Sequence, residues 1–340
     1  GQGCPPYHPK MMIKVWIYGY CTKVYTSRPL AKRLREDLIF IWLAGGQRPC
    51  FKTLSDFRSC RMQYLIDTVL SRVLLYLVEQ DYVNLEDSAF QWSRVNSTTH
   101  GKMGTVHELR VTSQEWQDIT WTHAVEIYEP AEVSFSKHAL LFVTGGSTPS
   151  QPGQRDVELG LKLANGCGAR VVMLHQTPNQ PLLGNRKEDD LITETWLKYL
   201  ETGDPTWPLL FPMVKSAVKT MDAATEYSRE HSGDAIEQFV ITGASKRGWT
   251  SWLTPVADQR VIATAPIVID VLNFRAQMNH QLDTWGDFSV QIQDYTRKGL
   301  VKRPGEAESR RENQLRQMMD PYSYRKELTL PKLLVVGTND

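Results

Sequence analysis

One segment decides the fold of this 340-residue chain: Gln238-Phe239-Val240-Ile241-Thr242-Gly243-Ala244-Ser245-Lys246-Arg247-Gly248. Its apolar, β-branched centre is typical of a buried strand. Small residues and Ser245 come next, and Trp249 to Val256 can continue as a helix. A serine at a sharp strand-to-helix turn has a strained backbone that presents its hydroxyl as a nucleophile. The segment therefore predicts a catalytic Ser245.

The motif departs from the usual G-x-S-x-G pattern of such turns. Gly243 is in place, but Arg247 occupies the position of the second glycine and Gly248 follows one residue later. By spacing alone, G-x-S-x-x-G is a common sequence. An alternative interpretation is that Ser245 only caps the following helix.

The sequence around this segment alternates between strand-like and helix-like stretches, which predicts an α/β fold with a mostly parallel sheet, similar to α/β-hydrolases. Three early strands form an antiparallel entry. The predicted strands are 90–96, 105–112, 123–128, 139–143, 169–174, 238–242, 260–268 and 331–337. The predicted helices are 157–164, 188–201, 211–231 and 249–256.

An α/β-hydrolase also needs an oxyanion hole and an acid. The backbone N–H of Lys246 can supply the first oxyanion donor, and that of Gly146 or Ser147, after an earlier strand, the second. The acid follows the nucleophile in the chain, and Asp340 stands at the end of the last predicted strand. The alternatives are a simple turn at Gly146 and a solvated terminal carboxylate at Asp340.

The catalytic histidine of this arrangement comes after the acid, and the sequence has no histidine after Asp340. His280, in an insertion between strands, is a substitute candidate, whereas His138 and His175 flank strands as core-edge residues. We therefore expect a C-terminally truncated hydrolase-like domain with impaired activity, because loss of a triad member leaves only the residual contribution of the oxyanion hole.

The first part of the chain has a different character. Residues 1–82 carry 12 Lys and Arg against 6 Asp and Glu, whereas the remainder carries 27 against 32. Helical spacing predicts helices from Pro9, from Ser27 to Gly45, and over 55–80. Lys32, Arg33 and Arg35 lie opposite the apolar stripe of the second helix, where they predict a contact with DNA phosphates. The alternative is a small helical bundle whose charges form a solvated face.

Composition excludes several other classes. Five cysteines without a C-x-x-C pair favour scattered reduced thiols over a zinc ribbon or a disulfide framework, and no cofactor or metal is predicted. The apolar stretch 38–47 is half of the roughly 20 residues that a membrane span needs. Residues 1–25 lack the pattern of a secretory signal, so as it stands the chain is expected in the cytoplasm.

The basic part resembles the N-terminal domain of InsH-like insertion-sequence transposases over residues 3–87. The resemblance rests on Tyr7-His8-Pro9-Lys10-Met11, Ile17-Tyr18-Gly19-Tyr20, Leu34-Arg35-Glu36-Asp37, Trp42-Leu43-Ala44-Gly45-Gly46 and Asp56-Phe57-Arg58. In that family the domain helps to bind the ends of the mobile element. The Asp-Asp-Glu catalytic core of that family has no counterpart after residue 87, so transposition is not expected.

Residues 88–340 resemble the PhoPQ-activated pathogenicity-related protein family. The matching motifs are Ala89-Phe90-Gln91-Trp92, Leu109-Arg110-Val111-Thr112-Ser113-Gln114-Glu115-Trp116, Pro178-Asn179-Gln180-Pro181-Leu182, Thr242 to Trp252, Trp285-Gly286-Asp287-Phe288-Ser289 and Leu333 to Asp340. The resemblance implies an α/β-hydrolase fold, export from bacteria and a link to virulence. It also implies that Ser245 is the nucleophile and Asp340 the acid.

Together these features predict a fusion of a helical, transposase-like domain over 1–86 with a truncated hydrolase-like domain over 88–340. Whether such a fusion is natural or arose as an assembly error stays open. The expected function is hydrolysis of an ester or amide in a small-molecule or peptide substrate. The alternatives are a DNA-binding remnant of a transposase and a non-catalytic interaction protein.

Overall fold

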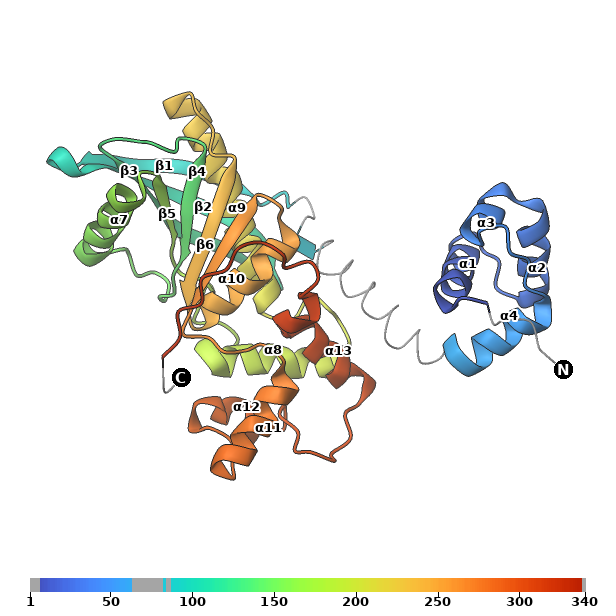
Figure 1. Ribbon diagram of the computed structural model, residues 1–340. Helices are drawn as coiled ribbons and strands as arrows, with labels where there is room; N and C mark the ends of the chain where they lie inside the picture. The colour runs from blue at the N-terminus through green and yellow to red at the C-terminus, as the bar shows by residue number, and fades with distance from the viewer. Residues whose placement is uncertain (1–6, 63–81, 84–86, 338–340) are drawn as a thin grey trace. The chain divides into compact units, whose positions relative to one another are not determined.

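A computed structural model describes residues 7–62, 82–83 and 87–337 (Figure 1). The chain divides into two compact units, Gly1–Leu74 and Leu75–Asp340. Tyr82 and Val83 belong to the apolar core of the second unit. Because residues 84–86 lie outside the described part, the domain boundary expected at 86–88 stays a prediction.

The first unit is helical, as the apolar spacing predicts. Its helices are α1 (Pro9–Cys21), α2 (Ser27–Glu36), α3 (Leu38–Leu43) and α4 (Phe51–Phe57), and a π-helical turn follows over Arg58–Met62. They enclose one apolar cluster, which includes Met12, Val15, Trp16, Leu30, Leu34, Phe40 and Leu54. Residues 63–80 of the predicted third helix lie outside the described residues.

The single helix expected from Ser27 to Gly45 is wrong, because the chain breaks at Asp37. The Asp37 carboxylate accepts a hydrogen bond from the Ile39 N–H at 3.0 Å and so caps a new helix, α3. The break rotates the apolar residues that follow it. Leu38 and Trp42, expected in the buried stripe, are 83% and 79% exposed.

The second unit contains one mixed sheet in the order β1-β2-β3-β5-β4-β6-β7. Its strands are β1 (Gln91–Thr99), β2 (Gly104–Trp116), β3 (Ile119–Pro130), β4 (His138–Val143), β5 (Arg170–Leu174), β6 (Gln238–Ala244) and β7 (Val261–Ile267). The first three strands and the β3–β5 pair are antiparallel, and β5, β4, β6 and β7 run parallel. The predicted antiparallel entry to a parallel sheet is therefore confirmed.

Helices cover both faces of the sheet (Figure 1). One face carries α7 (Gln154–Cys167), and the other carries α9 (Leu210–Ser232) and α10 (Lys246–Ala257). The remaining helices are α8 (Glu188–Thr202), α11 (Phe274–Trp285), α12 (Gln293–Arg297) and α13 (Arg310–Met319). This double cover explains why β5 is buried along its whole length: Val171 and Met173 face α7, while Val172 and Leu174 face the larger core.

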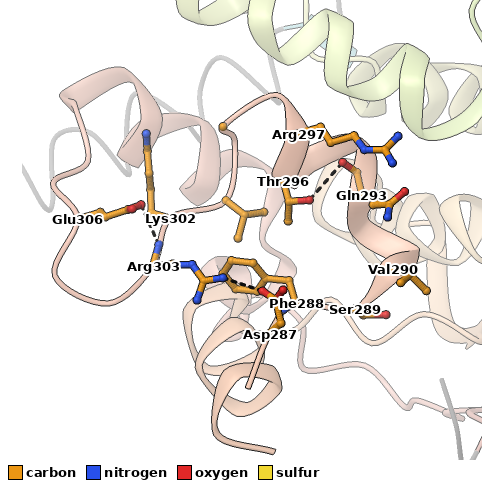
Figure 2. A pocket seen from close by; sticks show the side chains of 12 residues that line it. Asp287, Phe288, Ser289, Val290, Gln293, Thr296, Arg297, Lys302, Arg303 and Glu306 are labelled. Atoms are coloured by element: carbon orange, nitrogen blue, oxygen red, sulfur yellow. Dashed lines mark hydrogen bonds and ion pairs between the residues drawn. The ribbon is translucent and has the colours of Figure 1, made fainter. Parts of the chain in front are cut away.

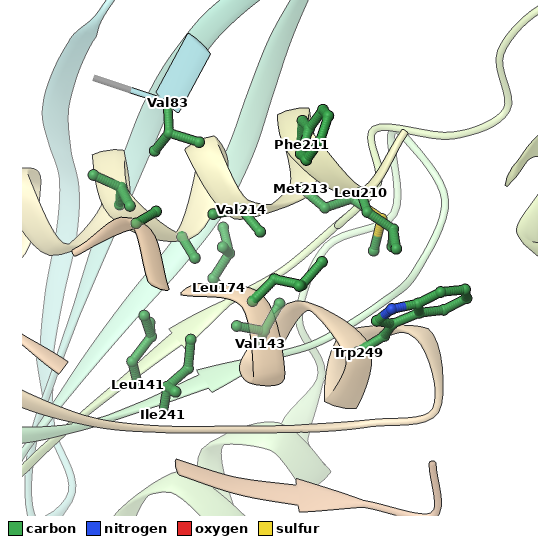
Figure 3. Close-up of a cluster of buried hydrophobic side chains, with 14 of the residues drawn as sticks. Val83, Leu141, Val143, Leu174, Leu210, Phe211, Met213, Val214, Ile241 and Trp249 are labelled. Carbon is green, nitrogen blue, oxygen red and sulfur yellow. The ribbon is translucent and has the colours of Figure 1, made fainter. Parts of the chain in front are cut away.

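The larger core lies between α9, α10 and the parallel strands (Figure 3). Leu141, Val143, Leu174 and Ile241 of the sheet lie in the same apolar cluster as Val214 of α9. All five of these side chains are fully buried. Because burial of such a side chain contributes roughly 1.5–3 kcal/mol, this layer holds the ends of the parallel strands in place.

The segment 331–337, expected as a last strand, makes only isolated parallel bridges to β7. The bridges pair Thr264 with Lys332 and Ile267 with Val335. Leu333 to Val336 are each at least 41% exposed. With little apolar surface buried on either side, the segment follows β7 without a continuous ladder.

One buried histidine makes stability depend on pH. His123 of β3 is fully buried, its Nδ1 donates to the carbonyl of His175 at 3.0 Å, and its Nε2 accepts from the Ser113 hydroxyl at 3.0 Å. Burial lowers the pKa of His123 to about 4. The unfolded chain therefore binds a proton between pH 6.5 and pH 4 that the folded chain does not bind.

We predict that stability falls as the pH drops through this window. Between pH 7 and pH 5 the loss attributable to His123 is about 2 kcal/mol. Urea unfolding of the intact chain and of His123→Gln at both pH values measures it, since glutamine does not titrate. Equal losses in both proteins would show that His123 is not responsible.

Candidate active site

Ser245 lies at the sharp turn that the sequence predicts, between the last residue of β6 and the first residue of α10. Its backbone has φ 55° and ψ −125°, a combination that a side chain with a Cβ rarely adopts. Its N–H donates to the carbonyl of Ile267 in β7 at 2.9 Å, and its carbonyl accepts from Trp249 at 3.0 Å. The neighbouring strand and the helix thus hold the strained conformation in place.

Two glycines make the turn sterically feasible. A Cβ at Gly243 would lie 2.7 Å from the Arg247 carbonyl oxygen. A Cβ at Gly248 would lie 2.5 Å from the Ile269 side chain and 2.9 Å from the Gly243 carbonyl oxygen. Gly248 therefore provides the close helix-to-strand contact, which explains why the motif tolerates a larger residue at position 247.

Arg247, itself buried, uses that position for an ion pair with Glu188, whose side chain is 39% exposed. Its Nη1 and Nη2 bind the two carboxylate oxygens of Glu188 at 2.8 and 2.7 Å, and its Nε donates to the Thr177 carbonyl at 2.6 Å. Burial acts to raise the pKa of Glu188, but the hydrogen bonds and charge of Arg247, with Gln180, hold that pKa below its ordinary value. The sequence predictions missed this pair, and Arg247 in place of a glycine was the only signal of it.

The predicted oxyanion donors emerge at the same edge of the sheet as Ser245. Parallel strands β4 and β6 are neighbours, and Val143 pairs with Gly243 at their carboxyl ends. The loop with Gly146 and Ser147 leaves β4 there, while Lys246 begins α10, where the first N–H groups have no carbonyl partner within the helix. Gly146 has φ 105°, a left-handed conformation that favours glycine.

The side chain of Lys246 belongs to a second ion-pair group, on the first turn of α8. Its Nζ lies 2.7 Å from Asp189. The Tyr295 hydroxyl donates to the same carboxylate at 3.0 Å, and Lys298 contacts Asp190 at 2.6 Å. The turn at Ser245 between β6 and α10 is called the elbow. The start of α8 therefore joins α10, the helix that follows the elbow, to the α12 region.

The predicted acid, Asp340, lies outside the described residues. His175, at the end of β5, is buried and bound to Glu126 and Thr144, each at 3.0 Å. His138 begins β4, at the opposite edge of the sheet from the elbow. His280 is exposed on α11 and contacts Thr284 at 3.5 Å. The structure thus brings the predicted oxyanion loop to the edge that carries Ser245. His138 lies at the opposite edge, whereas His175 lies at the carboxyl edge but is hydrogen-bonded to Glu126 and Thr144.

A cavity of about 720 Å³ lies in the segment between β7 and residue 331 (Figure 2). Arg303, which lines it, pairs with Asp287 at 2.7 Å, and its Cζ lies 5.2 Å from the centroid of the Phe288 ring. Lys302 pairs with Glu312 at 3.0 Å. Asp287 and Arg303 of the lining therefore pair with each other, whereas Lys302 pairs with a residue outside the lining. The sequence predictions did not identify this cavity.

The predicted DNA-contact residues lie on α2 in the first unit. Lys32, Arg33 and Arg35 are all exposed. Lys32 lies 3.8 Å from Glu36 and Arg33 lies 3.3 Å from Asp37, in pairs one helical turn apart. The basic face is therefore accessible, with two of its three charges near carboxylates.

Two further features concern metal binding and membrane spanning in the part of the chain that the structure describes. No group of three or more His, Cys, Asp or Glu side chains there is suited to a metal ion. None of the helices there combines the length and apolar character that crossing a membrane demands.

Known proteins resemble both parts of the chain. Residues 1–60 match the family model of a transposase domain. Autocrine proliferation repressor protein A of Dictyostelium discoideum is 36% identical over 273 residues, which cover 76% of this chain and 54% of that protein. This chain thus spans about half the length of that curated relative.

The fold also has a solved relative. Acetyl xylan esterase 1 from Thermoanaerobacterium sp. JW/SL YS485 matches with a TM-score of 0.51 and 12% identity, over 78% of this chain and 86% of that chain. At this identity the match establishes the α/β-hydrolase fold. Residues 79–340 match the family model of the PhoPQ-activated pathogenicity-related protein. The chain therefore belongs to the PhoPQ-activated pathogenicity-related protein family.

Proposed function

We propose that the second unit is a serine hydrolase that cleaves an ester or amide bond in a small-molecule or peptide substrate. The observation that carries the proposal is the strained backbone of Ser245 at the carboxyl edge of the parallel sheet. Strain of this kind persists where the surrounding structure holds it, and it is concentrated at active sites. The α/β-hydrolase fold supports the proposal, because its nucleophile occupies this turn.

The proposed mechanism follows the geometry of the turn. The Ser245 hydroxyl attacks the substrate carbonyl, while a general base removes the hydroxyl proton and transfers it to the leaving group, with Asp340 as the proposed acid of the arrangement. The N–H groups of Lys246 and of Gly146 or Ser147 stabilise the negative oxygen that forms. Water then hydrolyses the acyl-enzyme and releases Ser245.

The first prediction concerns covalent labelling of Ser245. The 340-residue chain reacts covalently with a fluorophosphonate probe at the Ser245 hydroxyl. Ser245→Ala abolishes labelling, and Ser232→Ala at the exposed end of α9 leaves it unchanged. Labelling is measured by mass spectrometry of the intact protein.

Equal labelling of the Ser245→Ala variant would remove Ser245 from the mechanism. If the unaltered chain does not react at all, the result supports the alternative that the α/β unit is a non-catalytic interaction protein. The relative from Dictyostelium discoideum, named as a proliferation repressor, favours that alternative.

A second function is proposed for the first unit, which is contact with DNA. Two observations favour it: the transposase-domain match over residues 1–60 and the accessible basic face of α2. Lys32, Arg33 and Arg35 would neutralise phosphates and release the counterions bound to them.

This proposal predicts a specific salt dependence. The full chain binds duplex DNA that carries an inverted repeat, and its affinity falls linearly with salt on a logarithmic scale. Changing Lys32, Arg33 and Arg35 to Ala together lowers that slope by about three, roughly one per lost contact. Fluorescence anisotropy across a salt series measures it.

The control removes three exposed positive charges from the second unit by changing Lys102, Lys162 and Lys326 to Ala. It keeps the full salt slope, although its net charge equals that of the α2 variant. Equal slopes for all three proteins, or binding independent of salt, would rule out contact through α2.

A further inference from the structure

Two loops at the carboxyl edge of the sheet are joined by backbone hydrogen bonds. They follow β4 and β5, and the first contains Gly146 and Ser147. The N–H of Gln176 donates to the Gly145 carbonyl at 2.8 Å, and the N–H of Thr177 donates to the Thr144 carbonyl at 3.1 Å. The β5 loop therefore fixes the backbone on which the proposed oxyanion donors lie.

Arg247 connects this pair of loops to the elbow. A Cβ at Gly145 would lie 2.7 Å from the Arg247 Cζ, so the guanidinium packs directly on the Gly145 backbone. The same guanidinium donates to the carbonyl of Thr177 in the second loop at 2.6 Å. Arg247 lies two residues after Ser245, and its backbone belongs to the first turn of α10. One side chain thus contacts both loops from the helix that carries Lys246.

A second route runs through Glu188 and Gln180. The Glu188 carboxylate accepts hydrogen bonds from both terminal nitrogens of Arg247. It also accepts one from the side-chain amide of Gln180 at 2.7 Å. Gln180 in turn donates to the Gly146 carbonyl at 3.3 Å and accepts from the Glu188 N–H at 2.9 Å. Hydrogen bonds therefore connect Arg247 through Glu188 and Gln180 to Gly146, whose neighbour Gly145 packs on the Arg247 guanidinium.

The energetics of this hydrogen-bond network indicate that it orients the loops more than it stabilises the fold. A half-buried ion pair such as Arg247–Glu188 contributes little net stability, because partial desolvation of the two charges offsets their attraction. Bidentate contact between a guanidinium and a carboxylate nevertheless restricts both groups to one plane and one direction. Glu188 itself has φ 50°, a strained backbone that these contacts hold.

We propose that Arg247 is a positioning residue of the active site. Through Thr177, Glu188 and Gln180 it sets the N–H groups of Gly146 and Ser147 relative to Ser245 and Lys246. It does not touch the reacting atoms. The catalytic consequence rests on the proposed hydrolase function, whereas the effect on the loops does not.

Hydrogen exchange of the full chain tests the effect on the loops. The amides of Thr148, Gln176 and Thr177 report it, since each donates to a carbonyl of the opposite loop. In Arg247→Ala we expect these amides to exchange at least about tenfold faster, with exchange elsewhere in the sheet unchanged.

The matched control is Arg260→Ala. Arg260 is also partly buried and binds two carboxylates, Asp222 at 2.7 Å and Asp258 at 2.6 Å, but it precedes β7 at the opposite edge of the sheet. The Arg260→Ala variant should leave the hydrogen-exchange rates of the loop amides unchanged. Equal exchange in the unaltered chain and in Arg247→Ala would overturn the proposal.

A variant that keeps the charge guards against a general loss of structure. Arg247→Lys retains a cation but cannot bind Thr177 and both oxygens of Glu188 together. It should loosen the same three amides, and circular dichroism monitors whether each variant folds. If Lys restored full protection of the loops, charge alone would be sufficient and the positioning role would be wrong.

Labelling kinetics test the catalytic consequence. We expect the fluorophosphonate rate constant of Arg247→Ala to fall about 100-fold, the order of losing one oxyanion donor, while that of Arg260→Ala does not change. Added methylguanidinium should restore part of the rate in Arg247→Ala alone. Looser loops with an unchanged rate would refute the catalytic role. If the unaltered chain is not labelled, the hydrolase function fails, and exchange still decides whether Arg247 positions the loops.

Discussion

The close contact between the start of α10 and strands β6 and β7 is the constraint on which the active site depends. There is no space for a Cβ at Gly243 or Gly248, so helix and strand backbones approach directly. That approach forces the chain to reverse within one residue, and Ser245 takes the strained conformation. The buried apolar layer between the sheet and α9 and α10 offsets the cost, since strain of this kind costs roughly 1–3 kcal/mol.

The usual G-x-S-x-G pattern is not required for this geometry, because within this turn it is the positions of Gly243 and Gly248 that leave no space for a Cβ. The second glycine is displaced by one residue, and position 247 becomes available for a long side chain. Arg247 then reaches two loops and an acidic helix start that a glycine could not contact. The departure from the common motif is therefore compatible with the elbow, and it adds a polar framework around the edge of the sheet.

That framework also ties the region after β7 to the elbow. The first turn of α8 receives Arg247 and Lys246 from α10, and Tyr295 and Lys298 from the α12 region. Acidic residues at a helix N-terminus are favoured by the helix dipole, so this turn is a stable place for such contacts. The α12 region is thus connected through the first turn of α8 to Lys246 and Arg247, which follow Ser245 in the chain.

Local apolar periodicity and small residues produce the alternation of strands and helices, the antiparallel entry and the turn at Ser245, so these features could be predicted from the sequence. It did not reveal the break at Asp37, where one side-chain cap outweighs helical spacing. The partners of Arg247 were decided only by the tertiary structure. Glu188 and Thr177 lie 59 and 70 residues away in the chain, and only the packing of parallel strands brings their loops to one edge.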